Sequence, residues 1–278
     1  MAKIAVTSDQ NERLPSARIL ARGDGWSISE MVCTLGPQDR PFEERHSSVS
    51  IAMVTAGSFQ YHSHVGRELM TPGSLMLGSA GQSFQCGHDH GTGDRCISFH
   101  YSHEFFDRLE AAPSFQSQRV PPTRALSPLI ARAASGLAEA ETMAWEELSI
   151  ELAAQTVELD RGLSIVSAGA SPGATARVAR IVRRIANDIA GPCEVSELAR
   201  EARLSPYHFL RTFQAVTGVT PHQYLVRLRL QRAGIRLRNE PDKIVDIALE
   251  CGFGDVSNFN RTFRAEFGVS PRTWRSQR

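Results

Sequence analysis

The sequence of 278 residues is almost without lysine, since Lys3 and Lys243 are the only two among its 31 basic residues. Nearly all of its positive charge therefore lies on arginine, whose planar guanidinium group suits phosphates and guanine edges. Net charge is lacking too, because 31 basic and 30 acidic residues give a formal charge of +1. Taken as a whole, this balance argues against a strongly basic nucleic-acid binder and against an acidic disordered tail.

Long apolar runs are also missing. The first twenty residues contain no apolar stretch of signal-peptide length, and nowhere do about 18 apolar residues follow one another, as a membrane-spanning helix requires. We therefore expect a soluble, cytoplasmic protein with no membrane partner. The five cysteines are too few for the disulfide framework of a secreted protein of this length, so we expect reduced thiols or metal ligands.

What the sequence does have is an uneven distribution of charge. From Ala174 to Arg278 it carries 18 basic and 10 acidic residues, a net charge of +8, whereas the preceding part has a net charge of −7. The length and the apolar fraction of 41% suit about two domains. The arginine excess of the C-terminal part suits the phosphate backbone of a nucleic acid.

The N-terminal part, residues 1–120, shows short strands separated by turns. Strands are predicted at 49–54, 58–61, 75–77 and 96–101. A break at Gly57 and a turn at 71–73 punctuate them. Strands so short and so regularly spaced favour an antiparallel β-barrel or jelly roll over an α/β sheet.

Residues 121–166 are predicted to be helical. Four apolar residues recur there at helical spacing and share one face: Trp145, Leu148, Leu152 and Leu159. This face either packs on the barrel or forms the contact of a homodimer, and the pattern leaves both alternatives open. The following segment, 167–175, is uncharged and contains glycine and proline, so it is predicted to be an interdomain linker.

Residues 176–278 contain an internal repeat with an offset of 50. The matches pair Phe209, Arg211, Thr212, Phe213, Gly218, Val219 and Pro221 with Phe259, Arg261, Thr262, Phe263, Gly268, Val269 and Pro271. Each copy has a short amphipathic helix, a three-residue turn and a second helix that carries the pattern F-x-R-T-F. This layout predicts two helix-turn-helix units, at 194–218 and 243–268.

The second helix of a helix-turn-helix buries one face and offers the other to the major groove of DNA. The phenylalanines, four residues apart, are predicted to form the buried face. The residues predicted to contact DNA are Tyr207, His208, Arg211, Thr212, Ser257, Asn258, Asn260 and Arg261. Arginine can pair with guanine and asparagine with adenine. The alternative for each residue is an ordinary solvated position.

Between the two copies, residues 221–239 are predicted to form one helix. Its arginines are expected to lie largely outward, namely Arg227, Arg229, Arg232, Arg236 and Arg238. A rigid spacer fixes the distance between two recognition helices, so that one monomer could occupy two successive major grooves about 34 Å apart.

These motifs resemble the C-terminal domain of the AraC/XylS family of bacterial transcription regulators over residues 175–278. The run IVDIALECGFGDVSNFNRTFRAEFGVSPRTWR is close to the signature of that family. The resemblance implies seven helices, two DNA-reading units, a homodimer on promoter half-sites and RNA polymerase as a partner. Arg203 stands where the second copy has Gly252, and a left-handed conformation at Arg203 would cost roughly 1 kcal/mol.

The N-terminal part is similar in outline to the cupin-type sensor domain of the same family, through the strings G-S-F-Q-Y and L-M-T-P-G-S-L-M-L-G. The resemblance implies an α+β protein of two domains. A cupin-like barrel and a helical dimerisation segment would precede an all-α DNA-binding domain. A small molecule or metal sensed in the barrel would then control promoter binding.

The run CGHDHGTGDRC, from Cys86 to Cys96, concentrates residue types that are scarce elsewhere in the chain. Two cysteines and two histidines around a glycine-rich turn match the ligand types of zinc or another transition metal. The candidate metal ligands are therefore Cys86, His88, His90 and Cys96. Two alternatives remain open: a solvated loop with cysteines packed as small hydrophobic residues, and a redox-sensing thiol pair.

The leading hypothesis is a transcription regulator with no catalytic residues. The alternative is a metal-dependent cupin enzyme joined to a DNA-binding domain, with ligands drawn from His62, His64 and Glu68 or from the histidines near Cys86. The spacing of these three residues fits the cupin pattern, but Gly57 lies five rather than six residues before His62. We therefore predict a regulator rather than an enzyme.

Overall fold

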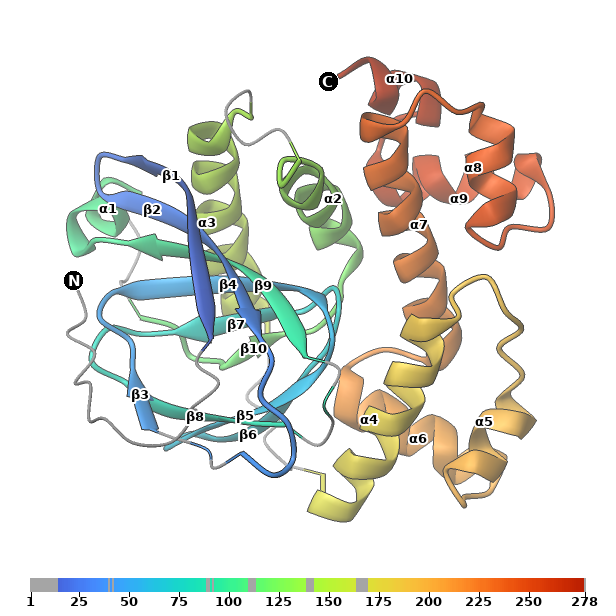
Figure 1. The fold of residues 1–278 in the computed structure, drawn as a ribbon, viewed down its shortest axis with the longest axis horizontal. Helices are drawn as coiled ribbons and strands as arrows, with labels where there is room; N and C mark the ends of the chain where they lie inside the picture. Colours follow the sequence, from blue (N-terminus) through green and yellow to red (C-terminus); the bar gives the residue numbers. More distant parts are fainter. Residues whose placement is uncertain are drawn as a thin grey trace.

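The computed structural model describes residues 15–39, 41, 43–88, 91, 93–109, 114–138, 143–163 and 170–277. Its N-terminal part consists mainly of antiparallel sheets and its C-terminal part of helices (Figure 1). We call residues 15–163, the sheets together with the helices that pack on them, the sheet domain, and residues 170–277 the helical domain. Within the described ranges, no helix combines the length and the apolar character that crossing a membrane requires.

The sheet domain contains two antiparallel sheets. The first has the strand order β1 (Ser16–Gly23), β2 (Trp26–Cys33), β9 (Asp94–Tyr101), β4 (Val49–Ala56), β7 (Leu75–Gly78) and β10 (Arg119–Val120). The second has the order β3 (Glu43–Arg45), β8 (Ser83–Gly87), β5 (Phe59–Ser63) and β6 (Gly66–Met70). The four strands predicted from the sequence correspond to β4, β5, β7 and β9.

The two faces of the six-stranded sheet have different partners, because successive side chains of a strand point to opposite sides. In β9, Ile97 and Phe99 belong to a buried apolar cluster shared with the helices. Ser98 and His100, which alternate with them, line a cavity between the two sheets. The sheet thus supports a helical layer on one face and, on the other, a cavity with a mixed apolar and polar lining.

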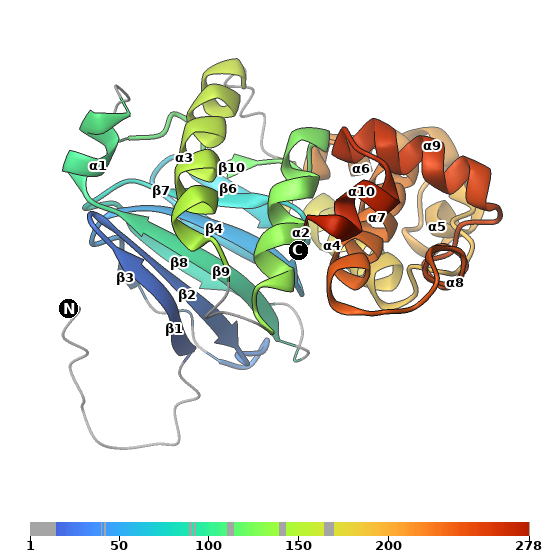
Figure 2. The ribbon, with the colours of Figure 1, turned by 90° about the horizontal axis from the view of Figure 1, so that it is seen from above.

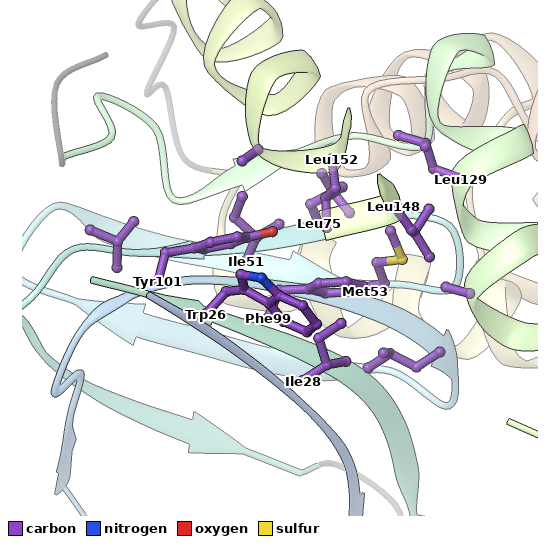
Figure 3. Packing of buried hydrophobic residues seen from close by; sticks show 14 of the residues in the cluster. Trp26, Ile28, Ile51, Met53, Leu75, Phe99, Tyr101, Leu129, Leu148 and Leu152 are labelled. Atoms are coloured by element: carbon purple, nitrogen blue, oxygen red, sulfur yellow. The ribbon is translucent and has the colours of Figure 1, made fainter. Parts of the chain in front are cut away.

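Helices cover the outer face of this sheet (Figure 2). They are α1 (His103–Arg108), the short 3₁₀ helix η1 (Arg124–Leu126), α2 (Ser127–Ser135) and α3 (Trp145–Gly162). Residues 121–166, predicted to be helical, therefore contain η1, α2 and α3. Figure 3 shows leucines of α2 and α3 facing aromatic and aliphatic side chains of the strands.

The prediction that Trp145, Leu148, Leu152 and Leu159 form a dimer contact is wrong for this chain. The first three side chains are at most 4% exposed, in the same cluster as Phe99, and Leu159 packs against that cluster. The physical reason is that the apolar outer face of the sheet needs a cover, and a helix with this stripe supplies it. The alternative that the sequence left open, packing on the sheets, is the one found.

Seven helices make up the described part of the helical domain, as the resemblance implied. They are α4 (Pro172–Asn187), α5 (Val195–Glu201), α6 (Pro206–Thr217), α7 (Pro221–Asn239), α8 (Ile244–Glu250), α9 (Val256–Phe267) and α10 (Pro271–Ser276). The linker predicted at 167–175 is too long at its C-terminal end, since α4 already begins at Pro172. Ser171 accepts a hydrogen bond from the backbone of Ala174, and Ser-Pro is a favoured helix start.

The internal repeat is visible in the backbone. Arg203 and Gly252 occupy equivalent turns with φ angles of 55° and 89°, so Arg203 does adopt the left-handed conformation expected from the sequence. Gly218 and Gly268 end α6 and α9 with φ angles of 80° and 76°. Each glycine is followed by a capped helix, α7 or α10. The same turn chemistry thus produces the same path twice.

The two domains are in contact along α2 and α7 (Figure 1). Ala131 of α2 belongs to the apolar cluster of the C-terminal helices, and Leu69 of β6 to the cluster around α4 and α6. Polar contacts accompany them: Arg227 of α7 donates to the carbonyl of Pro122 at 2.5 Å, and Arg119 of β10 to the carbonyl of Thr217 at 3.0 Å. The helical domain is therefore held in a defined position against the sheets.

Candidate functional site

Helices α6 and α9 each bury one face and expose the other, as the sequence predicted. Phe209 and Phe213 of α6 and Phe259 and Phe263 of α9 are completely buried. These rings fix the rotation of each helix about its axis, because they pack into the cores of their own units. The polar residues between them are consequently turned outward.

On α6, the residues predicted to contact DNA lie at the surface. Tyr207, 64% exposed, carries the guanidinium group of Arg211 at 5.8 Å over its ring, and Arg211 donates to the Tyr207 hydroxyl at 3.4 Å. His208 is exposed and Thr212 is half-buried. A cation held over an aromatic ring loses part of its freedom before any partner binds. Contact of these side chains with DNA stays a prediction.

On α9, Ser257, Asn258, Asn260 and Arg261 are all exposed. Asp255 caps the helix by accepting a hydrogen bond from the backbone of Asn258 at 2.7 Å. Arg261 donates to the side-chain oxygen of Asn258 at 3.1 Å, which orients the guanidinium group. The surface therefore offers arginine and asparagine, the residue types that read guanine and adenine.

The arginines of α7 correct one sequence prediction. Four of the five were expected to lie outward but are half-buried in contacts within the chain. Arg229 donates to the carbonyl of Ile189, just after α4, at 2.6 Å, and Arg236 pairs with the carboxylate of Glu250 in α8 at 2.7 Å. Arg232 is the exposed exception. Arginine binds backbone carbonyls well because it has five donors, so here it ties helices together.

A cavity of about 160 Å³ lies between the two sheets. Its lining is Pro15, Met31, Cys33, Leu35, Glu44, His46, Ser50, Ala52, Phe59, Met76, Phe84, Cys86, His88, Asp94, Cys96, Ser98 and His100. Aliphatic and aromatic side chains mix there with polar and titratable groups. A small molecule or an ion is the size of ligand that such a cavity can enclose.

His46 lies in the wall of this cavity as a buried histidine. Its ring nitrogens lie 2.9 Å from the hydroxyl groups of Tyr61 and Ser50, and the ring stacks on Phe84 at 4.2 Å. Burial, and secondarily the charge of His100, lowers the pKa of His46 to about 4. The neutral imidazole is therefore the stable form, since it can donate to one hydroxyl and accept from the other.

Three potential metal ligands meet where strands end. Cys33 is the last residue of β2, Asp94 is its cross-strand partner at the start of β9, and His88 follows β8. The Nε2 atom of His88 lies 2.9 Å from Asp94 Oδ2 and 3.4 Å from Cys33 Sγ. Burial alone would lower the pKa of His88, but hydrogen bonds with Asp94 and Cys33 raise it to about 10.

This group differs from the one predicted. Among the described residues, the one set of three or more such side chains with ligand atoms within 4.8 Å is Cys33, His88 and Asp94. Cys86 and Cys96 line the same cavity but lie outside that set, and His90 lies outside the described residues. The sequence could not reveal Cys33 or Asp94 as neighbours of His88, because the register of β2 against β9 joins them.

The structure gives less support to the two alternatives, a redox-sensing pair of Cys86 and Cys96 and an enzyme metal site at His62, His64 and Glu68. Burial raises the pKa of Cys86 and of Cys96 well above the usual range, which keeps both thiols protonated and slow to react. Glu68 pairs with Arg119 at 2.9 Å. No metal-binding set of His62, His64 and Glu68 occurs in the part of the chain that the structure describes.

The similarity of this chain to the known proteins named below is to its helical domain. A family model described as a helix-turn-helix domain matches residues 198–277. The HTH-type transcriptional activator RhaS of Klebsiella pneumoniae is 43% identical over 82 residues, which are 30% of this chain and 30% of the relative. The HTH-type transcriptional regulator Rv1931c of Mycobacterium tuberculosis is 38% identical over 85 residues, or 31% of this chain and 33% of the relative.

A solved structure gives a match of similar extent. The transcriptional regulator from Chromobacterium violaceum, described among AraC-type DNA-binding domain-containing proteins, is 30% identical. It covers 38% of this chain and 94% of its own, with a TM-score of 0.35. The chain spans about a third of the length of the curated relatives it matches.

Proposed function

This chain belongs to the AraC/XylS family through its helix-turn-helix domain, and from that premise we propose that it regulates transcription by binding promoter DNA through two helix-turn-helix units. The relatives are named as transcriptional activators and regulators. Those names favour a regulator over a cupin enzyme, and we assign no catalytic residues.

One observation carries the proposal: the same backbone arrangement occurs twice, 50 residues apart. Each copy passes from a short helix through a left-handed residue, Arg203 or Gly252, into a second helix. Each second helix begins at a capping side chain, Ser205 or Asp255, and ends at a left-handed glycine. Two helices presented in the same way suit two similar half-sites on DNA.

The exposed faces of α6 and α9 supply the chemistry of recognition. Arg211 contacts Tyr207 and Arg261 contacts Asn258, so both exposed guanidinium groups are partly ordered before DNA arrives. A side chain that is already ordered loses less entropy when it binds. Helix α7 joins the two units as a single helix of 19 residues, which suits occupation of two successive major grooves about 34 Å apart.

For the sheet domain we propose a cupin-like jelly roll that senses an effector. The two facing sheets and the mixed apolar and polar cavity between them support this interpretation. The contacts of Arg119 with Thr217 and of Arg227 with Pro122 connect the sheet domain to the end of α6 and to α7. An effector that favours one packing of the domains would thereby change DNA affinity, because such coupling requires different affinities for two states.

A homodimer and RNA polymerase remain proposed partners, as in the family that the sequence resembles. The apolar stripe of α3 is occupied by the sheet, so a dimer would need another surface. Two exposed apolar residues could belong to such a surface: Ile150 of α3 and Ile19 of the edge strand β1. Double-stranded DNA is the partner that the helix-turn-helix domain itself supports.

The test starts from genomic fragments recovered by mapping where the full-length protein binds. Fluorescence anisotropy on such a fragment should show Arg211→Ala and Arg261→Ala each weakening specific binding by roughly 1–3 kcal/mol. Arg22→Ala, an exposed arginine of β1, serves as the charge-matched control and should bind like the parent. Equal affinity of all four proteins would overturn the assignment of α6 and α9 as DNA-reading helices.

A further inference from the structure

We propose that Cys33, His88 and Asp94 bind one divalent transition-metal ion of the zinc type. The proposal goes beyond DNA recognition and stands independently of it. It rests on three side chains that different strands bring to one point at the edge of the interior cavity.

The donor set fits such an ion. Thiolate sulfur, imidazole nitrogen and carboxylate oxygen are the three ligand types that zinc uses in proteins. The ligand atoms of Cys33, His88 and Asp94 all lie within 4.8 Å of one another, so one ion can reach all three with small side-chain movements. Three protein ligands leave one tetrahedral position, which would open toward the cavity that these residues line.

The backbone holds the site in place. Cys33 and Asp94 are directly paired across β2 and β9. Gly93 and Gly57 pack closely beside them: a Cβ atom on Gly93 would lie 2.7 Å from the carbonyl oxygen of Cys33, and one on Gly57 would lie 2.3 Å from the carbonyl oxygen of Gly93. Both glycines have left-handed φ angles of 73° and 75°. This close packing fixes the spacing of the two ligands contributed by the strands.

The surroundings are shielded from solvent. The side chains of His88 and Asp94 are 4% and 7% exposed, and the ring of Phe59 lies 6.1 Å from that of His88. The competing explanation is a buried His88–Asp94 ion pair that merely fastens the end of β8 to β9. That explanation assigns no role to Cys33, whose sulfur also lies within contact distance of the same ring nitrogen.

The proposed metal site lies close to both the sheet domain's cavity and the helical domain. Cys33 and Asp94 also line a groove at the domain boundary, opposite Val182 and Ala186 of α4. A bound ion would therefore lie between the interior cavity and the helical domain. The same residues would then hold the ion and line the groove that faces α4 of the helical domain.

The first experiment measures metal content. The full-length chain, produced without a histidine tag and purified without chelator, is dialysed against zinc and then freed of loose ions by gel filtration. Elemental analysis should find roughly one zinc ion per chain in the parent and in the control Cys193→Ser, a cysteine of the helical domain. Cys33→Ser and His88→Gln should retain less than about a tenth of that amount, with unchanged helix content by circular dichroism.

The second experiment keeps the proposal testable if those variants fold poorly. Cobalt added to the parent protein should produce a thiolate-to-cobalt charge-transfer band, which Cys86→Ser and Cys96→Ser retain. Less than a tenth of an equivalent of metal in the parent, absence of the band, or its loss in Cys96→Ser but not in Cys33→Ser would each overturn the proposed ligand set. Neither readout involves DNA, so failure here leaves the proposed function standing.

Discussion

Gly218, the residue that caps the end of α6, and Pro121 of the sheet domain lie so close that a Cβ atom on Gly218 would come within 2.6 Å of Pro121 Cβ. The equivalent glycine of the second repeat, Gly268, has the same left-handed backbone but no neighbour within 4 Å of such an atom. The repeat thus supplies a matched pair of positions, one at the domain contact and one outside it.

We predict that Gly218→Ala is more destabilising than Gly268→Ala. Both variants lose about 1 kcal/mol, because alanine is disfavoured in the left-handed region, but Gly218→Ala also pushes against Pro121. Urea unfolding measures the free energy of both variants, and limited proteolysis between the domains reports whether the contact has loosened. Equal stability and equal proteolysis of the two variants would contradict the close contact.

A second prediction compares the two turns of the repeat. Gly252→Ala should lose about 2 kcal/mol or more, since a left-handed alanine there would also meet Ala190 and Arg229 at 2.8 Å. Arg203→Gly should be neutral or slightly stabilising, because it relieves the left-handed arginine at φ 55°. Thermal and urea unfolding check both values. A large destabilisation by Arg203→Gly would show that its side chain has another role.

The third prediction concerns pH and His46. Folding lowers the pKa of His46 from 6.5 to about 4. Between these two pH values the imidazole is protonated in the unfolded chain but neutral in the folded one. The parent protein therefore loses stability as the pH falls from about 6.5 toward 4. The loss attributable to His46 reaches about 2 kcal/mol at pH 5. His100, whose pKa burial also lowers, adds to this slope, and Glu44, whose pKa burial raises, opposes it.

His46→Gln isolates the contribution of this side chain. The variant should be less stable than the parent at pH 7, because it loses hydrogen bonds to Tyr61 and Ser50, but its stability should fall less between pH 7 and pH 5. Urea unfolding at both pH values provides the comparison. Parallel curves for the two proteins would mean that His46 is protonated in the folded state.

The fourth prediction concerns metal removal. Zinc that binds the folded chain at Cys33, His88 and Asp94 should raise the melting temperature by about 5 °C or more when it is well above its dissociation constant. A chelator should reverse the shift in the parent and in Cys193→Ser. Calorimetry on Cys33→Ser with and without zinc is the control, and an equal shift there would place the binding elsewhere.

Much of the helical domain could be predicted from the sequence alone. The offset of 50, the phenylalanines four residues apart and the capping residues are local signals, and local turn chemistry determines helix ends. Even the left-handed Arg203 follows from its alignment with Gly252. The exposed positions of Arg211 and Arg261 follow from the same periodicity, because burying one face of a helix turns the other outward.

Only the tertiary structure decided which partner each helix face or strand end contacts. The stripe of Trp145 and Leu148 identifies an apolar surface, but the sheet rather than a second chain covers it. The convergence of Cys33, His88 and Asp94 depends on the register of strands about 60 residues apart, which no short pattern in the sequence encodes. Periodicity specifies which side chains share a face, whereas long-range packing specifies their partners, since that choice depends on the whole chain.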